Sequence, residues 1–313
     1  MMYENDSRDL SFTSGFFILI ALGFAGLFAA AVVSIPVWTM VTGTSFTTMK
    51  EGMNDPANAN AVKLIQAISV ILGFLLPACF TSYLLNRKPL RLMGFRQPVT
   101  KKQIGLVLLI MFMSLFVAGA LGSFNTWIPI PAGWRAAFDK LEETYMQQVE
   151  IMAGLKSVGD YVVGLIVMAF LPALCEESIF RGGLQNFLNR ATKNAWLSII
   201  IVSILFSLVH FSYYGFLSRF FLGIVLGSVY YFTGSLWLSI LGHFFNNALA
   251  ITQLYFYTRE GKNIRDAMSD ELPFYWGLAA LPILIFLFLL LKKNSPGKPG
   301  GDLKVVNRIN FIE

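Results

Sequence analysis

The sequence predicts an all-α, polytopic membrane protein with about eight transmembrane helices in one bundle. Of its 313 residues, 56% are hydrophobic, 15% are aromatic and only 13% are charged, and the mean hydropathy is +0.62. Soluble domains carry about 25% charged residues, so this chain cannot cover its surface with polar groups in water. The composition therefore excludes a disulfide-stapled secreted scaffold, a disordered tail and an ordinary cytosolic enzyme.

Eight apolar runs predict the membrane spans, since a transmembrane helix takes about 20 mainly apolar residues. The first run follows an acidic start and is too long for the apolar part of a signal peptide, so we expect it to be retained. Three spans precede the longest outer loop, four follow it, and one precedes the tail. The predicted spans are 15–41, 61–86, 103–122, 159–176, 195–213, 216–232, 236–257 and 273–291.

These spans divide the chain into five segments. We expect a cytoplasmic N-terminal segment, a group of three helices, an outer loop with an amphipathic helix, a catalytic core of four helices (spans four to seven), and a last helix with a basic cytoplasmic tail. The chemistry is expected in the core because the ionisable residues within the spans gather there. The five segments are 1–14, 15–122, 123–158, 159–257 and 258–313.

Charge alternates between successive loops and predicts the orientation. The segment 87–102 holds six basic residues and no acid; together with Arg190, Lys193 and the tail from residue 292, this side carries thirteen basic and two acidic residues. The loops on the other side carry seven basic and ten acidic residues. Because basic loops stay in the cytoplasm, we predict that both termini are cytoplasmic, in a multi-pass protein of the cell (inner) membrane.

The longest outer loop contains an amphipathic segment at 133–155. Its apolar side chains recur in steps of three and four residues with charged residues between them, a pattern typical of a helix. Such a helix lies in the membrane interface with its apolar face toward the lipid. Interfacial packing is the favoured explanation, and a cover over a site is the alternative.

Few ionisable groups fall within the predicted spans, where a charge at mid-bilayer costs about 2.5–3.5 kcal/mol on insertion scales. Such groups are functional candidates, although salt bridges between helices would also explain some of them. We expect the arginine near the start of the sixth span to snorkel to the outer interface rather than to bind substrate. The groups are Lys63 and Asp160 near span ends, and Glu176, Glu177, Arg181, His210, Arg219 and His243.

Helical phase separates the roles of the two adjacent glutamates. Glu177 and Arg181 are four residues apart, so they share a helix face and can form a structural ion pair. Glu176 is rotated by about 100° from Glu177 and is free to face another group. The rise of about 1.5 Å per residue also brings Glu176, His210 and His243, from three different spans, to a similar depth in the bilayer.

One carboxylate and two imidazoles at one depth support two kinds of hydrolysis. A carboxylate and an imidazole can together take a proton from water, while a second imidazole and a carboxamide donate hydrogen bonds to the developing oxyanion. Two imidazoles and one carboxylate are also the usual ligands of a hydrolytic zinc ion. The residues alone leave both mechanisms open.

Three motifs on successive spans resemble those of a known protein family. Residues 176–181 have the pattern Glu-Glu-x-x-x-Arg, residues 206–210 the pattern Phe-x-x-x-His, and residues 243–247 the pattern His-x-x-x-Asn. In this order the motifs resemble those of the CPBP intramembrane proteases, also called the Abi or CAAX protease family, which are related to the type II CAAX prenyl endopeptidases. The motif region covers about 160–250 and contains both histidines of the chain.

The resemblance implies a peptidase and a role for each motif residue. Glu176 and His210 would activate water, and His243 and Asn247 would form the oxyanion hole. Family members are described both as glutamate-dependent and as metal-dependent; we favour the glutamate-dependent mechanism, which requires no cofactor. In the metalloprotease alternative, one zinc ion would be bound by Glu176, His210 and His243. The residues that would hold the site together are Glu177, Arg181 and Phe206.

The substrate implied by the resemblance is a hydrophobic or lipidated peptide in the lipid bilayer. It would be a prenylated CAAX-like segment or a bacteriocin-type peptide, since bacterial members are linked to bacteriocin maturation and self-immunity. We expect no nucleic-acid partner. Two other classes of function compete: a proton-coupled transporter, disfavoured because no inverted repeat is visible, and a non-catalytic immunity protein, disfavoured because no motif residue is lost.

Overall fold

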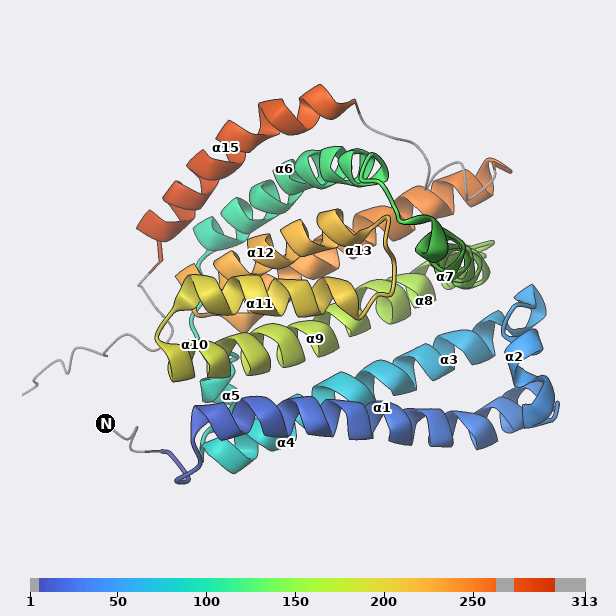
Figure 1. The fold of residues 1–313 in the computed structure, drawn as a ribbon, viewed down its shortest axis with the longest axis horizontal. Coiled ribbons are helices and arrows are strands. Elements are labelled where there is room, and N and C mark those ends of the chain that lie inside the picture. The colour runs from blue at the N-terminus through green and yellow to red at the C-terminus, as the bar shows by residue number, and fades with distance from the viewer. Residues whose placement is uncertain (1–5, 263–272, 296–313) are drawn as a thin grey trace, which may run out of the picture.

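The computed structural model describes residues 6–262 and 273–295, and all regular elements in this part of the chain are helices. The all-α class predicted from the sequence is therefore confirmed for these residues. Long helices run side by side and alternate in direction, so successive connections fall at opposite ends of one bundle (Figure 1). The predicted features within 1–5, 263–272 and 296–313, among them most of the basic tail, lie outside the described residues.

The N-terminal part of the bundle contains three long rods. The first rod begins after Ser11, whose hydroxyl accepts a hydrogen bond from the Ser14 N–H, and it ends at Gly43 in the left-handed conformation. The second rod is α3 and α4, joined without a break by the π-helical turn Ile71–Leu75. The bounds are α1 Phe12–Thr42, α2 Met49–Gly52, α3 Ala59–Val70, α4 Leu76–Leu85, α5 Pro89–Leu92 and α6 Lys101–Thr126.

The part of the bundle that holds the predicted catalytic residues begins with a kinked but continuous rod. Its three α-helical pieces, α8 to α10, are linked by the π-helical segments Leu165–Phe170 and Ser178–Gln185. Three further long helices follow it along the chain, and α15 comes last. The bounds are α8 Val158–Gly164, α9 Leu171–Glu177, α10 Asn186–Thr192, α11 Ala195–Leu208, α12 Phe216–Thr233, α13 Leu236–Arg259 and α15 Phe274–Lys293.

A long helix or rod covers most of each of the eight predicted spans, and six of these are long and apolar enough to cross a membrane. The fourth span is longer than predicted, because the rod from Val158 continues to Thr192. The fifth ends at Leu208 rather than at 213, which leaves 14 residues. The seventh, α13, has 24 residues but lower hydropathy, since His243, Asn246 and Asn247 interrupt its apolar sequence. The six are Phe12–Thr42, Pro56–Leu85, Lys101–Thr126, Val158–Thr192, Phe216–Thr233 and Phe274–Lys293.

The predicted basic loops gather at one end of the bundle. The segment between α4 and α6, the turn between α10 and α11, and the end of α15 all lie at the left in Figure 1. The Gln103 side chain connects two of these regions, because its amide nitrogen donates to the carbonyl oxygen of Asn294 at 3.3 Å. The described connections between α1 and α3 and between α6 and α8, the second of which contains α7 (Ala132–Met152), lie at the opposite end.

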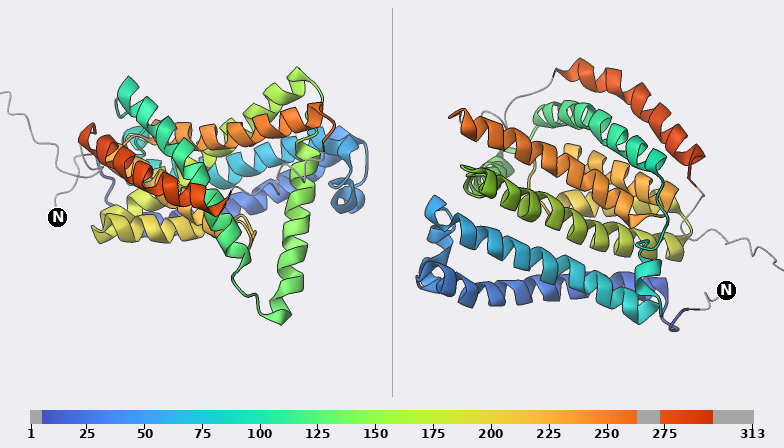
Figure 2. Two further views of the ribbon diagram at one scale, coloured as in Figure 1. Left: turned by 90° about the horizontal axis from the view of Figure 1, so that it is seen from above. Right: turned by 180° about the vertical axis from the view of Figure 1, so that it is seen from behind.

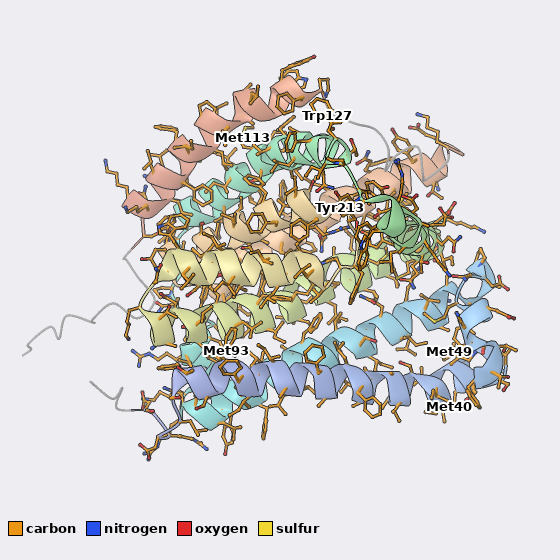
Figure 3. The ribbon with its side chains drawn as sticks, viewed as in Figure 1. Met40, Met49, Met93, Met113, Trp127 and Tyr213 are labelled. Carbon is orange, nitrogen blue, oxygen red and sulfur yellow. The ribbon has the colours of Figure 1, made fainter. Side chains whose placement is uncertain are left out.

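The predicted amphipathic helix is present as α7 and lies across the end of the bundle. It runs roughly crosswise to the long helices, as the view from above shows (Figure 2). The ring of Phe138 on α7 stacks on the ring of Tyr213, with 4.7 Å between centroids. Tyr213 belongs to the connection between α11 and α12 (Figure 3), so α7 packs on the segment that follows His210.

Glycines on α12 allow it to approach its neighbours closely. A Cβ atom at Gly223 would lie 2.9 Å from the Cβ atom of Ser203 on α11, and one at Gly227 would lie 2.8 Å from Oε1 of Gln185. Small residues of this kind let membrane helices pack with their backbones close together. The close packing also brings the Gly223 carbonyl of α12 within hydrogen-bond distance of Arg181.

Candidate active site in the helical core

The two adjacent glutamates are the last residues of α9, immediately before a π-helical segment. α9 ends at Glu177, and the segment Ser178–Gln185 widens the helix directly after it. π-Helical turns are rare and are frequent at functional sites. Both carboxylates are largely or wholly buried, with Glu176 9% and Glu177 0% exposed. The site therefore begins with two acidic groups that are removed from bulk water.

Glu177 is the centre of a buried polar network. Its Oε1 atom accepts a hydrogen bond from Nη1 of Arg181 at 2.8 Å, as the spacing of four residues predicted. The same oxygen lies 2.9 Å from Nδ1 of His243 on α13, a contact that the sequence did not predict. Arg181 also donates from Nη2 to the carbonyl oxygen of Gly223 on α12 at 3.3 Å. The network thereby connects the α8–α10 rod to both α12 and α13.

His243 lies between the two glutamates. Its Nε2 atom is 4.0 Å from Oε2 of Glu176, while its Nδ1 atom contacts Glu177. Because a carboxylate only accepts hydrogen bonds, the hydrogen on Nδ1 is directed to Glu177. With that single hydrogen the Nε2 atom of His243 is an acceptor, and in the imidazolium form it is a donor directed toward Glu176.

The Glu176 carboxylate has an oxygen atom that is available to bind a ligand. Its Oε2 atom, like that of Glu177, is buried and has no hydrogen-bond partner among the described residues. No contact comparable to the Arg181 and His243 contacts of Glu177 Oε1 engages Glu176. A buried carboxylate oxygen without a partner costs free energy, so such an atom in a native structure requires an explanation. The helical phase predicted that Glu176 would face away from the Glu177–Arg181 pair, and its position beside His243 agrees with that prediction.

His210 lies just beyond the end of α11. The predicted span of 195–213 had placed it within a helix. The chain turns at 209–210, and Phe211 has a φ of +50°, which is uncommon for a bulky residue. The Nδ1 atom of His210 is 2.8 Å from the carbonyl oxygen of Phe206, so it carries the hydrogen and leaves Nε2 free. His210 is also close enough to Glu176 and His243 for their charges to interact.

Phe206 holds the two imidazoles in place. Its ring centroid is 5.1 Å from that of His210 and 5.8 Å from that of His243. The Arg181 guanidinium covers the same ring at 4.6 Å. The buried Phe206 ring therefore contacts both histidines and the cation of the polar network.

Asn247 lies one helical turn beyond His243 on α13. Its amide oxygen accepts a hydrogen bond from Nδ2 of the neighbouring Asn246 at 3.3 Å. This contact leaves the amide nitrogen of Asn247 as a donor with no acceptor among the described residues. A donor on the same helix face as His243 suits the stabilisation of an anion between the two.

α7 contributes contacts to the site that its amphipathic pattern alone did not reveal. Glu142 accepts a hydrogen bond from the Ser212 hydroxyl at 2.7 Å, and Asp139 accepts one from the Tyr214 hydroxyl at 2.6 Å. This second hydrogen bond raises the pKa of the Tyr214 hydroxyl above its ordinary value. The two contacts fix the loop immediately after His210, and no sequence spacing indicates a contact between residues about 70 positions apart.

The carboxylates and imidazoles of the site are only partly gathered. Within 6–262 and 273–295, no three His, Cys, Asp or Glu side chains lie together so that they could hold a metal ion. Glu176 and His243 are close, and because Nδ1 of His243 is bonded to Glu177, its Nε2 atom is the nitrogen that faces Glu176.

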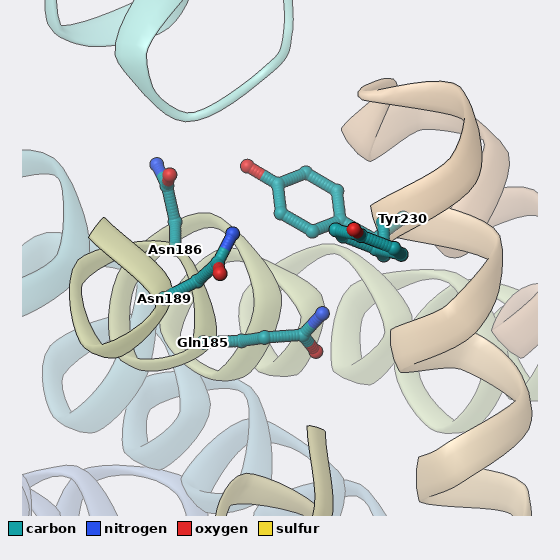
Figure 4. Close-up of a pocket in the computed structure, with 5 residues that line it drawn as sticks. Gln185, Asn186, Asn189 and Tyr230 are labelled. Atoms are coloured by element: carbon teal, nitrogen blue, oxygen red, sulfur yellow. The ribbon is translucent and has the colours of Figure 1, made fainter. Parts of the chain in front are cut away.

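Two hollows on the described surface lie away from these residues. One lies between α10 and α12 (Figure 4), where the Gln185 amide donates to the Gly227 carbonyl and the Asn186 amide to the Leu92 carbonyl. These hydrogen bonds hold helices together. The other is lined by residues 88–91 and Arg96 at the basic end. Neither hollow contains a predicted catalytic residue.

Comparison with known proteins agrees with the motifs. Residues 158–249 match the family model described as Type II CAAX prenyl endopeptidase Rce1-like. No curated protein and no solved structure matches the chain. The matched segment begins with α8 and ends within α13, so it contains the buried glutamates, both histidines and Asn247. The match thus supports the resemblance of this multi-pass membrane protein to the CPBP, or CAAX protease, family.

Proposed function

We propose that this protein is an intramembrane endopeptidase that hydrolyses a peptide bond in a hydrophobic or membrane-associated peptide, of the prenylated CAAX-like or bacteriocin type. The family match of residues 158–249 supports peptidase activity. The observation that carries the mechanism is the buried Oε2 atom of Glu176, which has no hydrogen-bond partner among the described residues and lies 4.0 Å from Nε2 of His243. A water molecule beside this atom would donate the hydrogen bond that the carboxylate lacks.

In the proposed reaction, Glu176 and His210 activate this water. The water gives a proton to the Glu176 carboxylate while the free Nε2 atom of His210 accepts its second hydrogen as a hydrogen bond. The resulting hydroxide attacks the peptide carbonyl. Glu176 then passes the proton to the leaving nitrogen, the C–N bond breaks, and the products are a new carboxyl group and a new amine.

The tetrahedral intermediate carries a negative oxygen that requires hydrogen-bond donors. In the proposed mechanism the Nε2–H of the His243 imidazolium and the amide nitrogen of Asn247 are those donors. Glu177 holds the His243 ring through Nδ1 and compensates part of its positive charge. Arg181 fixes Glu177 in turn, so that Glu177 and Arg181 position a donor without contacting the substrate.

Substitution of the proposed base tests this function. Purified Glu176→Gln and His210→Ala proteins should cleave a hydrophobic peptide about 10²–10⁴ times more slowly than wild type, the range expected for loss of general acid–base catalysis. Cleavage is measured by mass spectrometry, and size-exclusion chromatography verifies folding. Glu51→Gln on the exposed surface of α2 is the matched control and should cleave normally. Unchanged cleavage by folded Glu176→Gln would contradict the proposal.

We also propose that the reaction requires no metal ion. Treatment of the active protein with 1,10-phenanthroline should leave the cleavage rate unchanged, because the described side chains can supply the base and the oxyanion donors themselves. Elemental analysis of the same sample gives the metal content. Stoichiometric zinc that is removed together with activity would show instead that Glu176, His210 and His243 act as metal ligands.

A further inference from the structure

Arg219, in the first turns of α12, is a cation without an anionic partner next to the candidate active site. Its Nη1 atom is buried and makes no hydrogen bond, and no carboxylate in the described residues forms an ion pair with it. On α7, Asp139 and Glu142 are hydrogen-bonded to Tyr214 and Ser212 instead. The sequence predicted that Arg219 would snorkel to the outer interface; in the structure its guanidinium lies against α7 and the loop before α12, with Nη1 buried there.

Three neighbours hold the guanidinium of Arg219 in this position. It covers the ring of Tyr145 on α7, with 5.0 Å to the centroid. It also packs against Gly215, where a Cβ atom would collide with the Nη1 atom. It is close enough to His210 for the two charges to interact. The cation therefore lies between the helix α7 and the loop that joins α11 to α12, the loop that contains His210.

An unpaired guanidinium in this place favours the binding of an anion. A buried donor atom without a partner is costly, and a carboxylate can accept two parallel hydrogen bonds from one arginine. Stacking on an aromatic ring leaves the edge of the guanidinium free for such a bidentate contact. In a peptidase, the anion that necessarily arrives with a substrate is the carboxylate at the end of its chain.

We propose that Arg219 binds the C-terminal carboxylate of the substrate and so selects peptides with a free C terminus near the scissile bond. This inference rests on the proposed peptidase function and adds a specificity-determining residue to it. Because Arg219 packs on Gly215, in the loop that contains His210, only a short C-terminal segment can extend from the bound carboxylate to the attacked carbonyl. A long soluble segment after the cleavage position would leave the guanidinium unpaired.

Direct binding measurements test the inference without requiring turnover. The probes are two forms of a farnesylated peptide that ends in Cys-aliphatic-aliphatic-Met, one with a free carboxylate and one with a carboxamide. In the Glu176→Gln background the carboxylate form should bind about 10–100 times more tightly, the range for a charge-assisted hydrogen bond. The added Arg219→Gln change should remove this preference, and Arg219→Lys should keep part of it.

Two controls separate recognition from folding. The carboxamide peptide should bind equally with and without Arg219→Gln, which shows that the variant is folded. Arg259→Gln, an exposed arginine at the end of α13, should keep the full preference. Equal binding of both forms before the Arg219 change, or weakening of both forms by it, would overturn the inference and indicate a structural role or a lipid phosphate as the anion.

The same experiment distinguishes failure of this inference from failure of the proposed function. A wild-type protein that prefers the carboxylate form but cleaves neither peptide would refute the peptidase function and leave Arg219 as an anion-binding residue. A wild-type protein that cleaves both forms at the same kcat/KM would support the peptidase function and refute the role of Arg219.

Discussion

At the residue scale, the two adjacent glutamates have different surroundings although they have the same chemistry. The Oε1 atom of Glu177 accepts hydrogen bonds from Arg181 and His243, whereas no hydrogen bond joins the Glu176 side chain to a described residue; the Oε2 atoms of both are buried and without a partner there. The helical phase predicted this difference, because residues one position apart point about 100° apart. The contact between Glu177 and His243 was beyond prediction, since it joins residues on α9 and α13 that no spacing relates.

Removal of the Glu176 charge should therefore abolish peptide cleavage without lowering the stability of the protein. Glu176→Gln replaces a buried, unpaired carboxylate by a neutral group of the same shape, which removes a desolvation cost. We expect the thermal unfolding midpoint in detergent to remain equal to wild type or to rise, while peptide cleavage is lost. A substantial fall in the midpoint would show that Glu176 is a structural group.

Disruption of the buried ion pair between Glu177 and Arg181 should, in contrast, lower the stability of the protein. Arg181→Ala leaves Glu177 buried without its partner, and breaking a buried pair costs about 3–5 kcal/mol. The exposed pair between Lys88 and Asp6 is the comparison, because Lys88→Ala should change stability by less than about 1 kcal/mol. Denaturant unfolding of both variants measures the difference. Similar small losses of unfolding free energy in the Arg181→Ala and Lys88→Ala variants would contradict the structural role of Arg181.

At the element scale, the sequence predicted which segments form helices better than it predicted the residues at which those helices end. A helix covers most of each predicted span, and six of these helices or rods are long and apolar enough to cross a membrane, because the length of an apolar run reflects the thickness of a bilayer. The hydropathy of the sequence does not reveal that α11 stops at Leu208, since Val209 and Phe211 are apolar as well. The turn that ends α11 depends on the left-handed backbone of Phe211 and on the contacts of Ser212 with α7.

The contact between α11 and α12 gives a prediction for one glycine. In Gly223→Ala the added Cβ atom would lie 2.9 Å from Cβ and 3.1 Å from Cα of Ser203, so the helices must separate. Overpacking of this kind costs about 1–3 kcal/mol. Gly105→Ala on α6 has open space and should instead stabilise by roughly 0.5–1 kcal/mol. Equal changes of the thermal unfolding midpoint in the Gly223→Ala and Gly105→Ala variants would contradict the close packing of α12 on α11.

At the scale of the whole molecule, the two ends of the bundle differ in charge and in function. The basic segment between α4 and α6 and the end of α15 lie at one end, and α7 lies across the other (Figure 1). His210 belongs to the connection at the α7 end, where Glu142 holds the residue Ser212. The sequence alone predicted the alternation of the loops; it predicted a cover over a site only as the alternative for α7, and it did not indicate which loop α7 would contact.

This asymmetry predicts the orientation of the protein and the side from which its site is covered. We propose that the basic end is cytoplasmic, since basic loops are retained there. In a background with Cys79 and Cys175 replaced by serine, a membrane-impermeant maleimide should label Lys140→Cys on α7 in intact cells. It should label Arg91→Cys on α5 only after the cells are permeabilised. The reverse labelling would place α7 and the loop after His210 on the cytoplasmic side, and peptides would then approach Glu176 from the cytoplasm.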